Sequence, residues 1–137
     1  MEFAFTEEHL MIRDSAERFL AQVSDSHAVR AAMNSAQGHD PEVWQRIAQE
    51  LYWPALMVPE RFGGMGLGFV ELAILLEQSG RYLLGSPLFA TACLATPALL
   101  LGANEALQEH WLGAIAAGEV RATLAFASTP GLNADSV

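Results

Sequence analysis

A glycine-rich connection, residues 56–68 with the sequence LMVPERFGGMGLG, constrains this chain more than any other feature. Four of the eleven glycines fall within six residues, at Gly63, Gly64, Gly66 and Gly68. Glycine lacks a Cβ atom, so it can take positive φ values and allows a neighbouring backbone or a ligand to approach closely, at a cost in conformational entropy. We expect this segment to bring two helix layers close together and to shape one side of a ligand site.

A phosphate-binding loop is the alternative interpretation of the same glycines. The dinucleotide-binding pattern requires G-x-G-x-x-G between a strand and a helix. Residues 64–69 read GMGLGF and therefore lack the last glycine, and only Leu56, Met57 and Val58 could form the strand. These departures favour a structural loop.

Capping signals predict helices on both sides of the glycine-rich connection. Thr6 and Asn104 are N-cap residues, and Asp40 followed by Pro41 combines an N-cap acceptor with a proline in the first turn. Gly118 stands where a left-handed residue ends a helix. Together with the apolar periodicity, these signals predict five to six helices, at about residues 6–23, 26–34, 41–51, 69–80, 86–101 and 104–118.

Two of these helices carry further expectations. The segment from Phe69 to Gly80 is apolar on nearly every side, which predicts a central helix, and Glu77 and Arg81 are spaced as an i, i+4 ion pair. The helix that begins near Ser86 contains Pro97, which should kink or divide it. A membrane span is an alternative here, because the 23 residues from Tyr82 to Asn104 carry no charge. Interruptions by Gly, Ser, Thr and Pro, and the absence of a Lys or Arg cluster that would set an orientation, favour buried core helices instead.

The end of the chain changes from helical to alternating periodicity. Val120, Ala122, Leu124 and Phe126 alternate with smaller or more polar residues, which predicts one β-strand. A single strand leaves its backbone groups without partners. The fold class is therefore all-α, a bundle of five to six helices with one C-terminal strand, and either a segment that should follow is missing or another chain supplies the partner strand.

Composition excludes several functions. The net charge of −9 argues against nucleic acid and anionic membrane surfaces as partners. All seven cationic residues are Arg, so Schiff-base chemistry and a Walker A lysine are excluded. The single Cys93 cannot form a disulfide framework and is interpreted as a small core residue. No metal site is predicted, because the four histidines are far apart and are interpreted as surface residues. The N-terminus lacks secretory-signal features, so we expect a cytoplasmic protein.

The glycine-rich connection also resembles a known family motif. Residues 59–67 (PERFGGMGL) are similar to the P-E-x-[YF]-G-G-x-G-L segment in the N-terminal half of acyl-CoA dehydrogenases. The opening FTEE at residues 5–8, the stretch WLGAIAAGE at 111–119, and the strand leading into Ser128, Thr129 and Pro130 follow in the family's order. The resemblance therefore spans the whole chain.

The resemblance implies an architecture and a chemistry. Residues 1–118 would form the helical N-terminal domain and residues 119–137 the start of the middle β-domain. A C-terminal four-helix domain would follow, with noncovalent FAD held mainly by the last two domains. In the family a glutamate removes the α-proton of the acyl group while the β-hydrogen leaves as hydride to the flavin. That glutamate usually belongs to the C-terminal domain, so no catalytic residue is assigned in this sequence.

Two sets of binding residues are implied by the same resemblance. Phe126, Ala127 and Ser128 occupy the family's x-x-T-E-P segment, where backbone groups and a hydroxyl contact the flavin ring; Ser128 keeps a hydroxyl, and Thr129 departs from the glutamate. The motif G-A-G-S-D stands as GLNAD at 131–135, which keeps the first Gly and the Asp. The substrate-pocket candidates are Pro87, Leu88 and Thr91, for which ordinary core packing is the alternative.

Two functional hypotheses follow. In the first, the chain is the N-terminal portion of an FAD-dependent acyl-CoA dehydrogenase-like oxidoreductase and is inactive alone. The complete enzyme would have an acyl-CoA thioester as substrate and an electron-transfer acceptor as partner, and it would form a homo- or hetero-oligomer. The second is a noncatalytic helical interaction subunit that completes the active site of a partner dehydrogenase.

Overall fold

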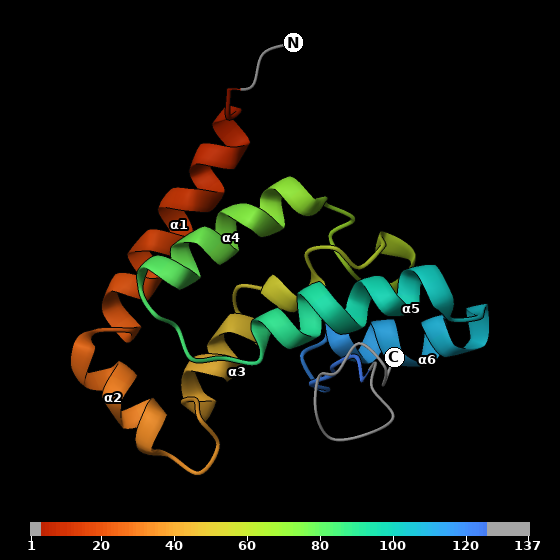
Figure 1. Cartoon of the computed structure of the whole chain (residues 1–137). Coiled ribbons are helices and arrows are strands. Elements are labelled where there is room, and N and C mark those ends of the chain that lie inside the picture. The colour runs from red at the N-terminus through yellow and green to blue at the C-terminus, as the bar shows by residue number, and fades with distance from the viewer. Residues whose placement is uncertain (1–3, 126–137) are drawn as a thin grey trace, which may run out of the picture.

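The computed structural model of the protein describes residues 4–125, and Figure 1 shows the arrangement of its helices. Two 3₁₀ turns, η1 (Trp53–Ala55) and η2 (Glu60–Phe62), lie within and beside the glycine-rich connection, and a π-helical stretch, η3 (Phe89–Ala95), runs directly into α5. The described part of the chain contains six α-helices: α1 (Glu7–Val23), α2 (Ser26–Asn34), α3 (Pro41–Gln49), α4 (Phe69–Arg81), α5 (Thr96–Gly102) and α6 (Glu105–Ala116). The predicted helical fold is confirmed.

The capping residues begin and end the helices as their chemistry predicts. The Thr6 hydroxyl accepts a hydrogen bond from the His9 amide, and Asp40 accepts from the amide of Glu42 at the start of α3. Asn104 accepts from the amide of Leu107 at the start of α6. Gly118 has φ of 72° after α6, which is the left-handed conformation expected of a C-terminal glycine.

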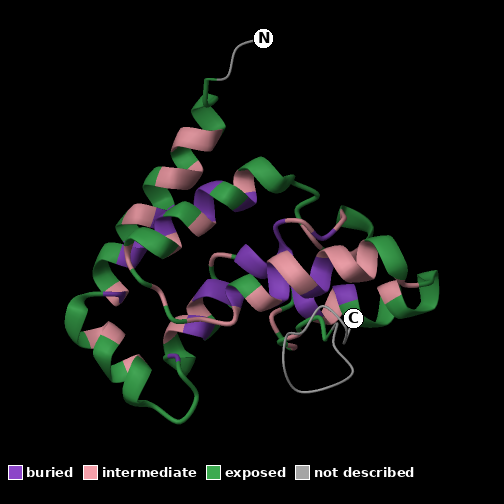
Figure 2. Ribbon diagram, in the orientation of Figure 1, coloured by how far each residue is buried: buried purple, intermediate pink, exposed green. Residues whose placement is uncertain are grey.

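Two apolar clusters form the core, and the segment after α3 contributes to both. The first cluster joins α1, α3, α4 and the start of η3, and it includes Trp53 and Leu56. The second cluster packs Ala55 and Val58 against α6. Figure 2 shows buried residues in the middle of the molecule, where they belong to α3, η1, η3 and α6, whereas α2 has none. The chain around η1 therefore links the two halves of the helical unit.

The glycine-rich connection folds back on this linking segment. Gly63 and Gly66 have φ of 81° and 63°, a region that side-chain-bearing residues seldom occupy. Gly64 has a different role, because an added Cβ would lie only 1.9 Å from the carbonyl oxygen of Val58. The close approach of two backbone segments explains why glycine is needed here.

The helix α4 is not the central helix that its apolar sequence predicts. It lies beside α1 (Figure 1), and Phe69 and Val70 are 66% and 52% exposed. Arg81 also pairs across to α1, where its Nη1 atom lies 3.2 Å from Glu17 Oε1, instead of pairing with Glu77. Tertiary contact with α1 thus selects the ion pair.

The helix after residue 86 is divided near Pro97, as predicted. Proline has no N–H group and its ring crowds the carbonyl one turn earlier, so the helix widens before it into η3. The Thr96 hydroxyl donates to the carbonyl of Thr91 at 3.0 Å within this wider turn. No helix among residues 4–125 has the length and apolar character to span a bilayer.

The predicted C-terminal strand is not confirmed. Residues 120–125 contain no strand, and Phe126 and Ala127 at its predicted end lie outside the described residues. The physical reason is the missing ladder partner, since no neighbouring strand exists among residues 4–125 to pair with the backbone.

Candidate functional site

The three residues expected to line an acyl pocket lie on the first turns after residue 86, but only one borders an open space. Leu88 is 1% exposed and belongs to the first apolar cluster. Thr91 is fully buried, and its hydroxyl is engaged by the chain itself. Pro87 lines an open hollow. Leu88 and Thr91 therefore lie behind the surface that Pro87 forms.

Thr91 joins this helix to the segment near the end of the described chain. Its Oγ1 atom lies 3.2 Å from the carbonyl oxygen of Ala122, to which it donates, and 3.3 Å from the Ala122 amide, from which it accepts. One side chain thus satisfies both backbone groups of a residue that was expected to be in a strand. The flavin-contact candidates Phe126, Ala127 and Ser128 lie outside the described residues.

The hollow beside Pro87, here called the Arg121 hollow, has a volume of about 380 Å³. Arg121 Nη1 lies 3.3 Å from His39 Nε2. Among residues 4–125, no carboxylate forms an ion pair with Arg121. Within the part of the chain that the structure describes, the lining combines polar and small apolar residues without an acid: Gln37, Gly38, His39, Ser86, Pro87, Ala90, Arg121, Ala122 and Thr123.

His39 corrects the prediction that all four histidines are surface residues. Its exposed fraction is 7%, and its Nδ1 atom lies 2.9 Å from the carbonyl oxygen of Gln37. A carbonyl can only accept, so Nδ1 carries the proton and Nε2 presents its lone pair to Arg121. No local pattern identifies this contact, because the two residues are 82 positions apart in the chain.

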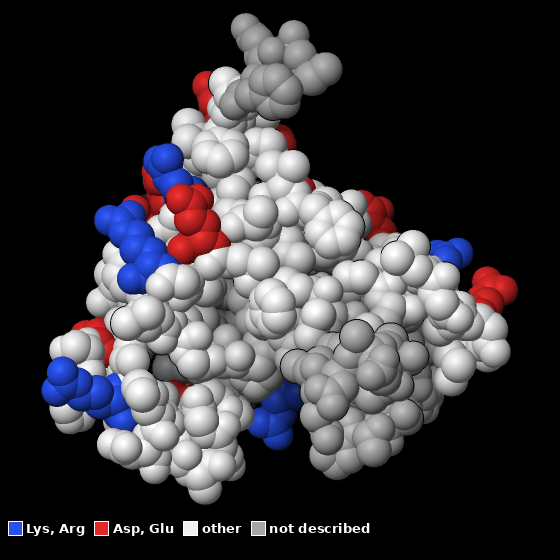
Figure 3. Space-filling view, viewed as in Figure 1, with Lys and Arg blue, Asp and Glu red and all other residues white. Residues whose placement is uncertain are grey.

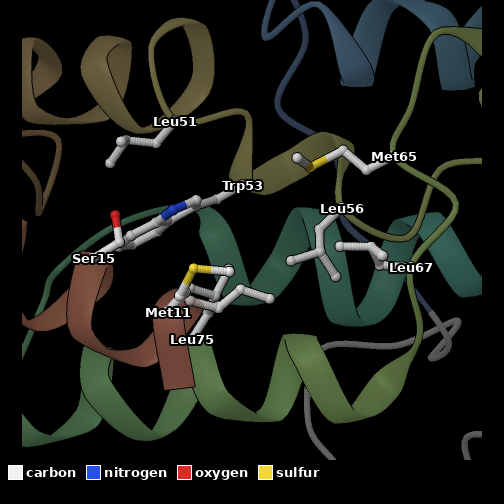
Figure 4. Close-up of a pocket in the computed structure, with 9 residues that line it drawn as sticks. Met11, Ser15, Leu51, Trp53, Leu56, Met65, Leu67 and Leu75 are labelled. Carbon is white, nitrogen blue, oxygen red and sulfur yellow. The ribbon is translucent and has the colours of Figure 1, made fainter. Parts of the chain in front are cut away.

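A second open site, here called the Trp53 pocket, has a volume of about 250 Å³. Figure 4 shows side chains converging on it from α1, from α4 and from the glycine-rich connection. Apart from Ser15 and the Trp53 indole, the lining residues that the structure describes are apolar, and none is charged: Met11, Ile12, Ser15, Leu51, Trp53, Leu56, Met65, Leu67 and Leu75. Such a surface can hold an apolar group but supplies no acid or base for catalysis.

The backbone of the glycine-rich connection is not arranged for a phosphate. A phosphate loop directs free N–H groups at its ligand. Here the amides of residues 62–67 all donate to backbone carbonyls, for example Gly66 to Val58 at 2.9 Å and Met65 to Ala55 at 3.0 Å. The Gly68 amide donates to Glu71 Oε2 at 2.9 Å. The structural interpretation of the glycines is therefore supported.

The remaining reactive groups form no catalytic cluster among residues 4–125. No group of three His, Cys, Asp or Glu side chains is placed to hold a metal ion in that part of the chain. Burial raises the pKa of the Cys93 thiol, which agrees with a packing role.

The contact between His9 and Glu71 is not indicated by any pattern in the sequence. His9 Nε2 lies 2.9 Å from Glu71 Oε1, and the pair links α1 to α4.

Comparison with known proteins places these features in a family. The family described as acyl-CoA dehydrogenase, N-terminal domain, matches residues 6–119. The acyl-CoA dehydrogenase IpdE2 of Mycolicibacterium smegmatis is 34% identical over 109 residues, which cover 80% of this chain and 35% of that protein. The chain thus spans about a third of the length of this curated relative.

Solved structures share the same fold. The Tcur3481-Tcur3483 steroid ACAD aligns with a TM-score of 0.81 and 27% identity, over 92% of this chain and 34% of that one. The ChsE4-ChsE5 complex from Mycobacterium tuberculosis aligns with a TM-score of 0.84 and 24% identity, over 97% of this chain and 36% of that one. The second likeness is evidence of fold alone.

Proposed function

The chain belongs to the acyl-CoA dehydrogenase family, and on this premise we propose that it forms the N-terminal portion of an FAD-dependent oxidoreductase that dehydrogenates an acyl-CoA thioester between its α- and β-carbons. The observation that supports this proposal most directly is the coincidence of the family match at 6–119 with the helical unit α1–α6. We further propose that residues 1–118 are this domain and that residues 119–137 begin a β-domain.

The catalytic base and most of the cofactor site would belong to other parts of the complete enzyme. FAD, when bound, supplies the acceptor for the hydride that leaves the β-carbon. The amides of the glycine-rich connection are already hydrogen-bonded, so the described residues offer no phosphate cradle there. We propose that Phe126, Ala127 and Ser128 contact the flavin ring, with the chain that leads to them held by the Thr91 hydroxyl at Ala122.

The acyl group would lie against the start of the helix after residue 86. In this proposal Pro87 forms part of the wall, because it borders the Arg121 hollow. Leu88 and Thr91 would not touch the acyl group, since both are buried beneath the surface that Pro87 forms. Their contribution would be to keep the wall and the flavin-contact segment in register.

We also propose that an electron-transfer acceptor is a protein partner of the complete enzyme and that it contacts the Trp53 pocket. Among the described residues, the lining of the pocket has none of the cations that the phosphates of coenzyme A would require, whereas its apolar character suits an apolar side chain of another protein. A Met65→Asp change should slow electron transfer to the protein acceptor while dye reduction stays unchanged. Met33→Asp is the matched control, because Met33 is 75% exposed and lies outside the pocket. Equal rates for both variants with the protein acceptor would refute this contact.

The main test uses the native assembly. Purified from its source, the assembly containing this chain should carry flavin absorbance through gel filtration and reduce a dye when an acyl-CoA is added. The 137-residue chain alone, supplied with FAD, should do neither. An assembly that contains the chain without flavin or acyl-CoA oxidation would refute the proposed function, and strong activity of the chain alone would refute its dependence on other parts.

The alternative, a noncatalytic interaction subunit, is favoured by the exposed apolar surface. Leu101 is 90% exposed and Phe89 is 57% exposed. Much of the surface over α4 and α5 in Figure 3 is uncharged, whereas charges gather over α1 and α2. A native mass that shows a stoichiometric second polypeptide carrying the catalytic base would support this role, and a stable monomer would count against it.

A further inference from the structure

The Arg121 hollow concentrates hydrogen-bond donors around one cation in a chain whose net charge is −9. Among residues 4–125 its lining contains no Asp or Glu, so a bound anion would meet no like charge from this part of the chain. Thr123 and Gln37 add polar groups to the lining, and Pro87 and Ala90 supply apolar surface. A group that is anionic at one end and apolar at the other matches this distribution.

The contact between Arg121 and His39 orients the guanidinium without neutralising it. Because Nδ1 of His39 donates to the Gln37 carbonyl, its Nε2 accepts from Arg121 Nη1 at 3.3 Å. This bond uses one of the five N–H groups of the guanidinium and leaves four for a ligand. A planar fork of this kind matches the two oxygens of a carboxylate.

Backbone packing holds together the loops that carry Gly38 and Ser86, which both line the hollow. A Cβ at Gly85 would lie 2.9 Å from the carbonyl oxygen of Gly38, so the loop before α3 and the loop after α4 approach closely at this point. The amide of Leu88 donates to Ser86 Oγ at 3.3 Å, which leaves the Ser86 hydroxyl hydrogen free to donate. The hollow thus presents the exposed Arg121 guanidinium, hydrogen-bonded to His39, an available hydroxyl and an apolar wall at Pro87.

We propose that the Arg121 hollow binds a carboxylate, and that the substrate of the complete enzyme is an acyl-CoA whose acyl group carries a carboxylate at its far end. The second half of this proposal rests on the proposed function, because it identifies Pro87 with the acyl wall. A single arginine balances one negative charge, which favours a carboxylate over a phosphate dianion.

Binding to the 137-residue chain tests the first half directly, whatever the enzyme does. Adipate should produce saturable NMR shifts at the His39 ring and the Arg121 guanidinium, and dimethyl adipate and inorganic phosphate should not. The shifts should disappear in Arg121→Met and persist in Arg61→Met, a matched change at an arginine that contacts Gln108 elsewhere. The carboxylate site would be overturned if adipate produced no shifts, if the shifts persisted in Arg121→Met, or if only phosphate produced them.

Turnover by the flavin-loaded native assembly tests the second half. Adipoyl-CoA and hexanoyl-CoA have the same chain length and differ in the terminal carboxylate. In Arg121→Met the KM for adipoyl-CoA should rise at least about tenfold, the lower range for losing a hydrogen bond to a charged group. The fold loss in kcat/KM should be clearly smaller for hexanoyl-CoA than for adipoyl-CoA, and Arg121→Lys should restore part of the loss for adipoyl-CoA.

The two proposals fail in different ways. Equal effects of Arg121→Met on both thioesters would overturn the assignment of the substrate class, even if adipate binds. Oxidation of neither thioester, nor of any other acyl-CoA, would refute the proposed function, while the adipate titration would still decide whether the hollow binds a carboxylate.

Discussion

Replacing Gly64 by Ala should destabilise the protein strongly, because the new Cβ atom would clash with the backbone carbonyl group of Val58. The Cβ position lies 1.9 Å from the Val58 carbonyl oxygen and 2.4 Å from its carbonyl carbon. Atoms of this kind are in contact near 3.5 Å, so the two segments must separate by more than about 1 Å. Val58 is fully buried and cannot move toward solvent.

The separation would also break a hydrogen bond. The Gly66 amide donates to the same Val58 oxygen at 2.9 Å. Overpacking of a core site costs about 1–3 kcal/mol, and a buried group that loses its partner costs about 1–3 kcal/mol. The expected loss is therefore about 2–6 kcal/mol, a large part of the roughly 5–15 kcal/mol that stabilises a typical domain. Gly64→Val should be at least as harmful.

Urea unfolding of the 137-residue chain, followed by far-UV circular dichroism, measures this loss. The midpoint should fall by at least about 1 M. Gly80→Ala is the matched control, because an added methyl group at Gly80 in α4 meets nothing within 4 Å and should raise stability by up to about 1 kcal/mol. If Gly64→Ala unfolds at the midpoint of the unmodified chain, the close approach is wrong. Normal stability together with a selective loss of FAD from the complete enzyme would instead assign the segment to the cofactor.

Three further predictions concern single side chains. Thr91→Val should lower the unfolding free energy by about 1–2 kcal/mol and reduce hydrogen-exchange protection at the Ala122 amide, because both hydrogen bonds between these residues are lost. The pKa of Glu71 is lowered mainly by a hydrogen bond from its own backbone amide and next by the hydrogen bond from the His9 ring. The ionised Glu71 carboxylate therefore stabilises the fold at neutral pH, and this stabilisation is lost as the pH falls and the carboxylate is protonated. Glu71→Gln should make the stability fall less steeply between about pH 5 and 3. Gln78→Met should raise the unfolding free energy by about 0.5–2 kcal/mol, because Gln78 Oε1 is buried without a partner in the described part of the chain.

Each of these predictions has a contrary outcome. Thr123→Val, at an exposed hydroxyl, should change stability by less than about 0.5 kcal/mol, and an effect as large as that of Thr91→Val would remove the special role of the buried hydroxyl. An acid unfolding profile that Glu71→Gln leaves unaltered would contradict the pKa argument. A destabilised Gln78→Met would indicate that the oxygen has a partner.

Sequence patterns located the helices well because helix ends are determined by neighbours in the chain. Ser26–Asn34 was predicted with the observed bounds, and Thr6, Asp40 and Asn104 act as the expected caps. The motif at residues 59–67 identified the family that the comparison confirms. By contrast, the central position predicted for α4 is wrong, because apolar composition does not say which face another helix or another domain will cover.

The candidate site was less predictable because its contacts join distant parts of the chain. The proposed wall residues Pro87, Leu88 and Thr91 came from resemblance, which did not distinguish the one that borders a hollow from the two that are buried. The sequence predicts a surface histidine at His39, because nothing near it in the chain reveals the contact with Arg121. The flavin-contact candidates remain predictions.

The sequence by itself determined where this protein is helical, where it must turn and to which family it belongs, because hydrogen bonds within a few residues, proline geometry and the absence of Cβ atoms act locally. Only the tertiary structure decided how Gly64 meets Val58, how the Thr91 hydroxyl replaces a strand partner at Ala122 and how His39 orients Arg121. These arrangements depend on which buried surfaces pack together, and many residues contribute to that choice at once.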